Sequence, residues 1–170
     1  MSDNPPDEER ILDRVAQGAP ESPPAVIEMV VWLSRLSKTH ESVVARLNEQ
    51  HGLLRSETGV LFALWVMNET EGVRPSVLAN ALEQTTGGMT ATLRRLVEAG
   101  LIERVADPSD GRVLLARLTQ QGKKVGLESF VGMVQWHETA FGGFDEQRQA
   151  VILTVLQDLF AAIDGRRDLT

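Results

Sequence analysis

The chain has 170 residues, which is enough for one domain that buries a core, with or without arms. It contains no cysteine, which excludes disulfides, thiol-based redox sensing and zinc sites built from thiolates. Its net charge is −7, and it has neither a run of about 18 apolar residues nor a signal-peptide leader. We therefore expect a cytoplasmic protein without a membrane span.

The first 24 residues are rich in proline and in acidic side chains. This composition is typical of a mobile segment, so residues 1–24 are predicted to form a flexible N-terminal arm. Within the arm, the stretch from Glu8 to Gln17 could instead form a short helix.

A long amphipathic helix is predicted from Ala25 to Gln50, within a segment that covers residues 25–54. Its apolar side chains recur every three or four positions, as on one face of a helix. They are Val26, Val30, Leu33, Leu36, Val43 and Leu47, and His40 lies on the same face. Gly52 ends this helix.

Residues 55–118 predict three shorter helices followed by a β-hairpin. Ser56–Asn68 and Pro75–Leu82 have helical periodicity, and proline is tolerated in a first turn. A further helix begins at Thr85 or Thr86, because either hydroxyl can cap an unpaired backbone N–H. The unit is mainly α-helical.

The last of these helices has two distinct faces and ends at Gly100, which permits a left-handed exit. One face is apolar, with Met89, Leu93, Leu96 and Val97, and the other carries Gly87, Ala91, Arg94, Arg95 and Glu98. Small and hydroxylated residues at its start would let the backbone approach a DNA duplex closely, and the arginines one turn later would reach further. These candidate contacts are Thr85, Thr86, Gly87, Gly88, Thr90, Arg94 and Arg95.

Two β-prone runs, Leu101–Val105 and Val113–Leu118, flank a turn at residues 107–111. A helix that runs into such a hairpin is a winged helix-turn-helix, which indicates DNA binding. The same residues have two alternative interpretations. The arginines could only solvate a surface, and Glu103, Asp107 and Asp110 could act as paired carboxylates, but a solvated turn would not raise a carboxyl pKa.

The charge of the chain is unevenly distributed. Residues 74–124 contain 8 basic and 5 acidic residues, whereas the remainder contains 9 basic and 19 acidic residues. Local charge sets the electrostatic field at a phosphate backbone, because salt screens more distant charges. The acidic total is therefore compatible with DNA binding through the basic segment.

After about residue 25 the sequence resembles the MarR (multiple antibiotic resistance regulator) family of dimeric bacterial winged-helix repressors. The resemblance rests on Thr-Gly-Gly-Met-Thr with Arg94–Leu96, on residues 99–104, on Asp-Pro-Ser-Asp-Gly-Arg at 107–112, and on Leu118-Thr119 with Gly122. It implies that Arg112 enters the DNA minor groove and that Asp110 holds it in place. Arg74 departs from the family pattern, which usually has a capping serine there; it could contact phosphate or be a weak cap.

Two further helices are predicted in residues 119–170, one from Thr119 to Ala140 and one from Asp145 to Ile163. Apolar residues surround more of the last helix than one face of a small monomer could cover. A second copy of the chain would cover them, and residues 25–54 and 119–170 would then form the dimerisation region. The alternative is a helix enclosed within one subunit.

The resemblance also implies a cleft for a small aromatic or phenolic effector. The candidate lining residues are Trp32, Arg35, His40, Phe62 and Trp65. Each residue also has an alternative role without ligand binding, since aromatic residues at helical spacing usually lie in the core and an arginine side chain is usually solvated. The three histidines are too dispersed for a metal motif, and we expect no metal and no cofactor.

The predicted function is a homodimeric regulator that binds a pseudo-palindromic operator in double-stranded DNA. We expect a repressor that a small molecule releases, with activation as the lesser possibility. The alternative is a winged-helix module that binds another protein and no DNA. An enzyme is not expected, because the sequence has no phosphate-binding Gly-Lys motif and no nucleophile elbow.

Overall fold

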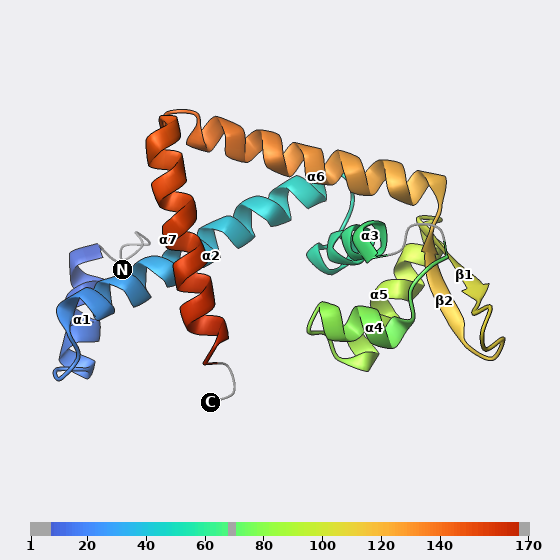
Figure 1. The fold of residues 1–170 in the computed structure, drawn as a ribbon, viewed down its shortest axis with the longest axis horizontal. Coiled ribbons are helices and arrows are strands. Elements are labelled where there is room, and N and C mark those ends of the chain that lie inside the picture. The colour runs from blue at the N-terminus through green and yellow to red at the C-terminus, as the bar shows by residue number, and fades with distance from the viewer. Residues whose placement is uncertain (1–7, 68–70, 167–170) are drawn as a thin grey trace, which may run out of the picture. The chain divides into compact units, whose positions relative to one another are not determined.

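The computed structural model describes residues 8–67 and 71–166, and the chain divides into two compact units, Met1–Glu57 and Thr58–Thr170. The described residues form seven helices and one two-stranded antiparallel hairpin (Figure 1). The predicted fold class, mainly α with a β-hairpin wing, is confirmed. No helix in the described part of the chain combines the length and apolarity needed to cross a membrane.

The first unit contains helices α1 (Glu8–Gly18) and α2 (Pro24–Glu49), which contact each other. Of the two predictions for the N-terminal segment, the short helix is therefore the one observed for residues 8–18. The part of the predicted flexible arm at residues 1–7 lies outside the described residues. Helix α2 starts with proline in its first turn, where the missing N–H has no intrahelical partner to lose.

The apolar face of α2 differs from the predicted one. Val26, Val30, Leu33 and Leu36 are exposed, whereas Ile27, Val31, Val43 and Asn48 are buried. The buried positions follow a stripe one residue further along the helix over its first half. The predicted apolar stripe is thus exposed in its first half, whereas Val43 of the same stripe is buried.

The second unit begins within helix α3 (Arg55–Met67) and continues with α4 (Pro75–Ala81) and α5 (Thr86–Glu98). All three bounds lie within one residue of the predicted ones, except that Asn68, the predicted end of α3, lies outside the described residues. The Glu57 carboxylate accepts a hydrogen bond from the Leu54 backbone N–H at 2.8 Å, which satisfies a donor at the start of α3.

Strands β1 (Ile102–Ala106) and β2 (Leu114–Leu118) form the hairpin, with Ile102 opposite Leu118 and Ala106 opposite Leu114. Strand β1 is shifted by one residue from the predicted run Leu101–Val105. Strand β2 begins one residue later than the predicted run Val113–Leu118. Gly100 has φ +68°, so it supplies the left-handed exit from α5 that the sequence predicts.

The helices α3 to α5 and the hairpin share one apolar core. Its largest fully buried side chains come from every one of these helices and from β1; they are Val60, Leu61, Leu64, Leu78, Met89, Leu93, Leu96 and Ile102. Of the predicted apolar face of α5, Val97 is the exception, because it is exposed. Thr92 is buried beside that face instead. We call residues 58–118 the winged-helix lobe.

Helix α6 (Gln120–Phe141) is fastened to the lobe at its first turn. The Thr119 hydroxyl accepts the Gly122 backbone N–H at 3.0 Å and lies 2.8 Å from the Gly100 carbonyl oxygen, to which it can donate. A Cβ at Gly122 would overlap the Leu101 carbonyl oxygen, so glycine is required for this close approach. The predicted cap at Thr119 is confirmed.

Helix α7 (Glu146–Asp164) is capped by Asp145, whose side chain accepts the Arg148 backbone N–H at 2.7 Å. No described residue of α7 is buried. Six of its large apolar residues are exposed, with exposed fractions from 46% for Leu156 to 67% for Phe160, and Ile152 and Leu159 are half-buried. The dimer and the helix enclosed within one subunit both stay predictions for this helix.

Candidate nucleic-acid interface

The start of α5 presents an exposed, polar and sterically open surface. Thr85 is the N-cap, and its hydroxyl accepts the Gly88 backbone N–H at 3.1 Å, which decides between the two predicted caps. Thr86, Gly88 and Thr90 are exposed, and the Thr90 hydroxyl donates to the Thr86 carbonyl at 2.8 Å. Each threonine hydroxyl retains bonding capacity, since Thr85 can still donate and Thr90 can still accept.

Arg94 and Arg95 follow one turn later and differ in how they are held. Arg94 is 73% exposed and lies 3.8 Å from Glu98, a solvent-exposed pair of little strength. Arg95 is half-buried, and its Nη2 lies 3.4 Å from the Thr92 hydroxyl. Arg94 is thus able to exchange its carboxylate for a phosphate at small cost, whereas Arg95 is positioned by the body of the helix.

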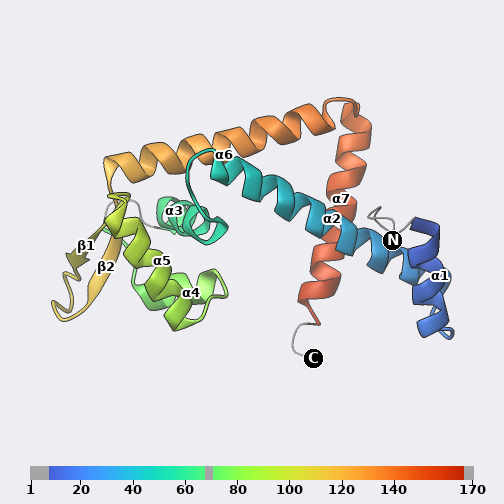
Figure 2. The same ribbon diagram turned by 180° about the vertical axis from the view of Figure 1, so that it is seen from behind.

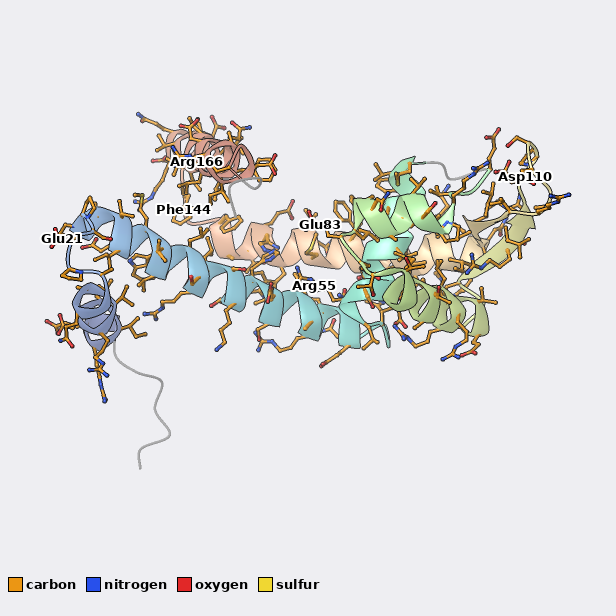
Figure 3. All side chains as sticks on the ribbon, turned by 90° about the horizontal axis from the view of Figure 1, so that it is seen from below. Glu21, Arg55, Glu83, Asp110, Phe144 and Arg166 are labelled. Atoms are coloured by element: carbon orange, nitrogen blue, oxygen red, sulfur yellow. The ribbon has the colours of Figure 1, made fainter. Side chains whose placement is uncertain are left out.

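The turn of the hairpin carries Asp110 and Arg112, both of which are exposed. Figure 2 shows this turn at the end of the hairpin that points away from α4 and α5, and Figure 3 labels Asp110 there. The Asp110 carboxylate accepts the backbone N–H of Arg112 at 3.1 Å. Asp110 therefore shapes the backbone of the turn, and among the described residues no carboxylate pairs with the Arg112 guanidinium.

Asp107 departs from the expectation of a fully solvated turn, because it is buried. Its carboxylate accepts the Ser109 hydroxyl at 2.6 Å and the Ser109 backbone N–H at 2.8 Å, and it accepts two hydrogen bonds from Arg74 at 2.9 and 2.6 Å. The Ser109 bonds and then the Arg74 bonds lower the pKa of Asp107 to about 2, against burial, which acts to raise it. A carboxylate with this pKa is not a proton donor at neutral pH.

Glu103 and the other carboxylates of the hairpin were considered above for metal binding. Among the described residues no three histidine or acidic side chains are placed to hold a metal ion. Glu103 pairs instead with Arg117 on the opposite strand, at 3.0 Å. On the same hairpin, burial lowers the pKa of the Arg104 guanidinium from its ordinary value.

Two of the predicted effector residues meet in the second unit. Phe62 and Trp65 of α3 lie 5.9 Å apart between ring centroids, and Phe130 of α6 stacks on Phe62 at 5.0 Å. A cavity of about 10 Å³ adjoins this aromatic cluster, with Lys123 and Gly126 of α6 in its wall. Such a cavity holds about one water molecule, so the three rings fill the space that they enclose.

The sequence prediction missed Phe130. The sequence indicates Phe130 only weakly, because an aromatic residue on an amphipathic helix usually joins the core. The remaining candidates, Trp32, Arg35 and His40, lie on α2 in the first unit and are exposed. The Arg35 guanidinium lies over the Trp32 ring at 5.1 Å, a cation–π contact.

A model of the MarR family matches residues 51–113, which span α3, α4, α5, β1 and the turn of the hairpin. This segment is therefore similar to the MarR family. The HTH-type transcriptional regulator BilQ of Clostridium symbiosum is 24% identical over 101 residues, which cover 59% of this chain and 70% of BilQ. The MarR-family relationship predicted from the sequence motifs is thereby confirmed.

Solved structures show that the similarity of fold extends beyond the matched segment. CouR from Rhodococcus jostii, solved bound to p-coumaroyl-CoA, has a TM-score of 0.66 and 22% identity, covering 79% of this chain and 90% of CouR. A mutant MepR from S. aureus, solved bound to an oligodeoxyribonucleotide, has a TM-score of 0.58 and 19% identity, covering 79% of this chain and 97% of MepR. The described chain thus shares the winged-helix fold of CouR and MepR.

Proposed function

We propose that this chain is a homodimeric, sequence-specific DNA-binding regulator, and that it acts as a repressor which a small aromatic effector releases. The observation that carries the proposal is the exposed surface formed by the start of α5, Arg94 and the hairpin turn with Arg112. The MepR structure with bound DNA supports this interpretation, because it shares the fold.

Helix α5 has the features of a recognition helix. Its apolar face is buried in the lobe, so the helix is rigidly held, while its start exposes backbone and hydroxyl groups at Thr86, Gly88 and Thr90. Small side chains let a helix enter a major groove deeply, and threonine hydroxyls contact phosphates or base edges. Arg94 and Arg95 would contact the phosphates or bases beside them.

The hairpin turn supplies the second contact of each subunit. Arg112 is exposed and without a carboxylate partner among the described residues, and a guanidinium suits the narrow, strongly negative minor groove. The Asp110 carboxylate holds the backbone at Arg112, which fixes where the side chain starts. One recognition helix and one wing per subunit read too few bases for strong specificity, which is why two copies are needed.

The exposed apolar residues of α7 support the dimer. Leu153, Leu156, Phe160 and Ile163 are each about half exposed or more, and no described residue of α7 is buried. A continuous apolar surface of this kind is unfavourable in water and marks an association surface. A second copy related by a two-fold axis would bury it and would place two recognition helices on a pseudo-palindromic operator.

The aromatic cluster of Phe62, Trp65 and Phe130 supports an aromatic effector. CouR, which shares the fold, was solved with the aromatic thioester p-coumaroyl-CoA. Because the cavity beside the rings holds only about 10 Å³, an effector would have to displace one of them, and that movement would couple binding to the arrangement of α3 and α6. Trp32, Arg35 and His40 remain separate candidates in the first unit.

The test is a fluorescence anisotropy titration of the purified protein with DNA from upstream of its own gene, at two salt concentrations. The proposal expects saturable binding to one palindromic segment that weakens steeply with salt, and weaker binding when aromatic acids or their thioesters are added. Equal affinity for an unrelated duplex would contradict sequence specificity. An absence of any binding would favour a module that binds another protein.

A further inference from the structure

The segment that leads into α4 is joined to the hairpin by its backbone. Val73 exchanges two backbone hydrogen bonds with Ala116 of β2, of 2.8 and 2.9 Å. Gly72 has φ +94°, and a Cβ there would lie 2.7 Å from the Ala116 carbonyl oxygen, so only glycine fits. The residue after Val73 is therefore held next to the middle of β2.

That residue is Arg74, which occupies the N-cap position of α4 but makes no capping hydrogen bond with its side chain. Its Nε and Nη2 both donate to the Asp107 Oδ2 atom, at 2.9 and 2.6 Å. Asp107 is 7% exposed, whereas the Arg74 side chain is 47% exposed. The cation thus reaches from the start of α4 across to a buried carboxylate at the end of β1.

Asp107 also forms hydrogen bonds with residues of the hairpin turn. Its other oxygen, Oδ1, accepts both the hydroxyl and the backbone N–H of Ser109, and its carbonyl accepts the Asp110 N–H at 3.2 Å. Asp110 in turn holds the backbone N–H of Arg112. A continuous series of hydrogen bonds therefore joins Arg74 on the helical part of the lobe to the residue that enters the minor groove.

We propose that Arg74 is a positioning residue for DNA binding: through Asp107 it fixes the hairpin turn relative to α4 and α5, so that Arg112 and the recognition helix meet one duplex together. This inference rests on the proposed function. It assigns a role to Arg74, which occupies an N-cap position without capping the helix. Instead of a cap, the Arg74 side chain makes two charge-assisted hydrogen bonds that connect two elements.

The test compares the DNA affinity of four variants by anisotropy: Arg74→Ser, Asp107→Asn, Arg112→Ala and the double variant Arg74→Ser with Arg112→Ala. The serine restores a capping side chain, so α4 is not weakened. We expect Arg74→Ser and Asp107→Asn each to weaken binding roughly three- to thirtyfold. In the Arg112→Ala background, Arg74→Ser should have no further effect, because Arg74 acts through the wing.

A matched control is Arg117→Ser, which removes the same charge and also breaks an arginine–carboxylate pair of the hairpin, with Glu103. It should leave DNA affinity within about twofold, since that pair does not reach α4. Amide hydrogen exchange gives a readout without DNA. The Ser109 and Arg112 amides should exchange faster in Arg74→Ser, whereas the amides of α5 should not change.

Other outcomes would overturn the inference. If Arg74 contacted phosphate itself, the losses of DNA affinity in Arg74→Ser and Arg112→Ala would add. The salt dependence of binding would then fall by about one ion, and Asp107→Asn would not reproduce the effect. If the pair were only structural, melting would change and DNA affinity would not. A wild-type protein without DNA affinity would refute the proposed function as well, whereas normal affinity of Arg74→Ser would refute this inference alone.

Discussion

The winged-helix lobe and helix α7 use the same kinds of apolar side chain in opposite ways. In the lobe, Leu78, Leu93 and Leu96 are essentially inaccessible to water, whereas in α7 Leu153 and Leu156 are about half exposed. Burial of apolar surface is the main favourable contribution to folding, so the lobe has a core of its own. Helix α7 buries little apolar surface within one chain, and its exposed apolar residues are typical of a surface for association.

This difference in burial predicts a difference in how the stability of the two regions depends on protein concentration. Stability of the lobe should not depend on protein concentration, whereas any contribution of α7 should depend on it, because a second copy is required. The following predictions test this contrast and then the interface that the lobe carries.

The largest effect is expected in the lobe core. Leu93→Ala should lower the free energy of unfolding by about 2–5 kcal/mol, because Leu93 is fully buried and its loss leaves a cavity. Urea denaturation measures this at several protein concentrations. Leu153→Ala on α7 is the matched substitution, and its cost should vary with concentration. A Leu153→Ala cost as large as that of Leu93→Ala at every concentration would show that α7 is buried within one chain.

The second effect concerns association through α7. Leu156→Asp places a charge on the proposed interface and should weaken dimerisation by on the order of a hundredfold. Light scattering should then give a mass near the 18.7 kDa of one chain, instead of twice that mass. Gln157→Asp adds the same charge at an exposed polar position, and a dimer equally weakened by it would exclude a specific apolar interface.

The third effect concerns the wing. Arg112→Ala should weaken operator binding by about 10- to 100-fold, since each specific arginine contact contributes about 1–3 kcal/mol. Dimer mass and melting temperature should not change, because Arg112 is exposed. Arg46→Ala on α2 removes the same charge outside the lobe and serves as control. Unchanged operator affinity in Arg112→Ala would refute the assignment of the hairpin as a DNA-binding wing.

A smaller effect is expected at the start of α5. Thr85→Ala removes the side-chain acceptor of the Gly88 N–H and should cost about 1 kcal/mol of stability. Thermal unfolding measures this cost, with Thr86→Ala as the neighbouring control that removes no cap. A larger loss of stability in Thr86→Ala than in Thr85→Ala would be incompatible with the observed capping.

The smallest effect is confined to acid. The pKa of Asp107 is lowered from 3.8 to about 2 in the folded chain, so its ionised form stabilises the fold above the unfolded pKa. That contribution should be lost as the pH falls from about 4 through 2. The difference in unfolding free energy between wild type and Asp107→Asn should thus be constant near neutral pH and shrink in acid. A difference that does not change with pH would contradict the lowered pKa.

Local signals in the sequence predicted much of this structure. The caps at Thr119 and Asp145, the exit at Gly100 and the turn at residues 107–111 were predictable because each depends on the chemistry of a few neighbouring residues. Only part of the predicted apolar face of α2 is buried, because the first half of this helix offers two apolar stripes and the chain buries Ile27 and Val31 instead of Val26 and Val30. Asp107 and Phe130 show the same limit, since the burial of Asp107 and its pairing with Arg74, and the stacking of Phe130 on Phe62, depend on partners distant in sequence.

Native mass spectrometry of the protein with a duplex from upstream of its own gene tests the central claim most directly, because it counts chains and DNA in one measurement. The account predicts a complex of two chains and one duplex, and no complex of one chain. It also predicts that Leu156→Asp and Arg112→Ala each deplete this complex, the first by separating the chains and the second with the dimer intact. A dominant complex of one chain per duplex, or a dimer that never retains the duplex, would contradict it.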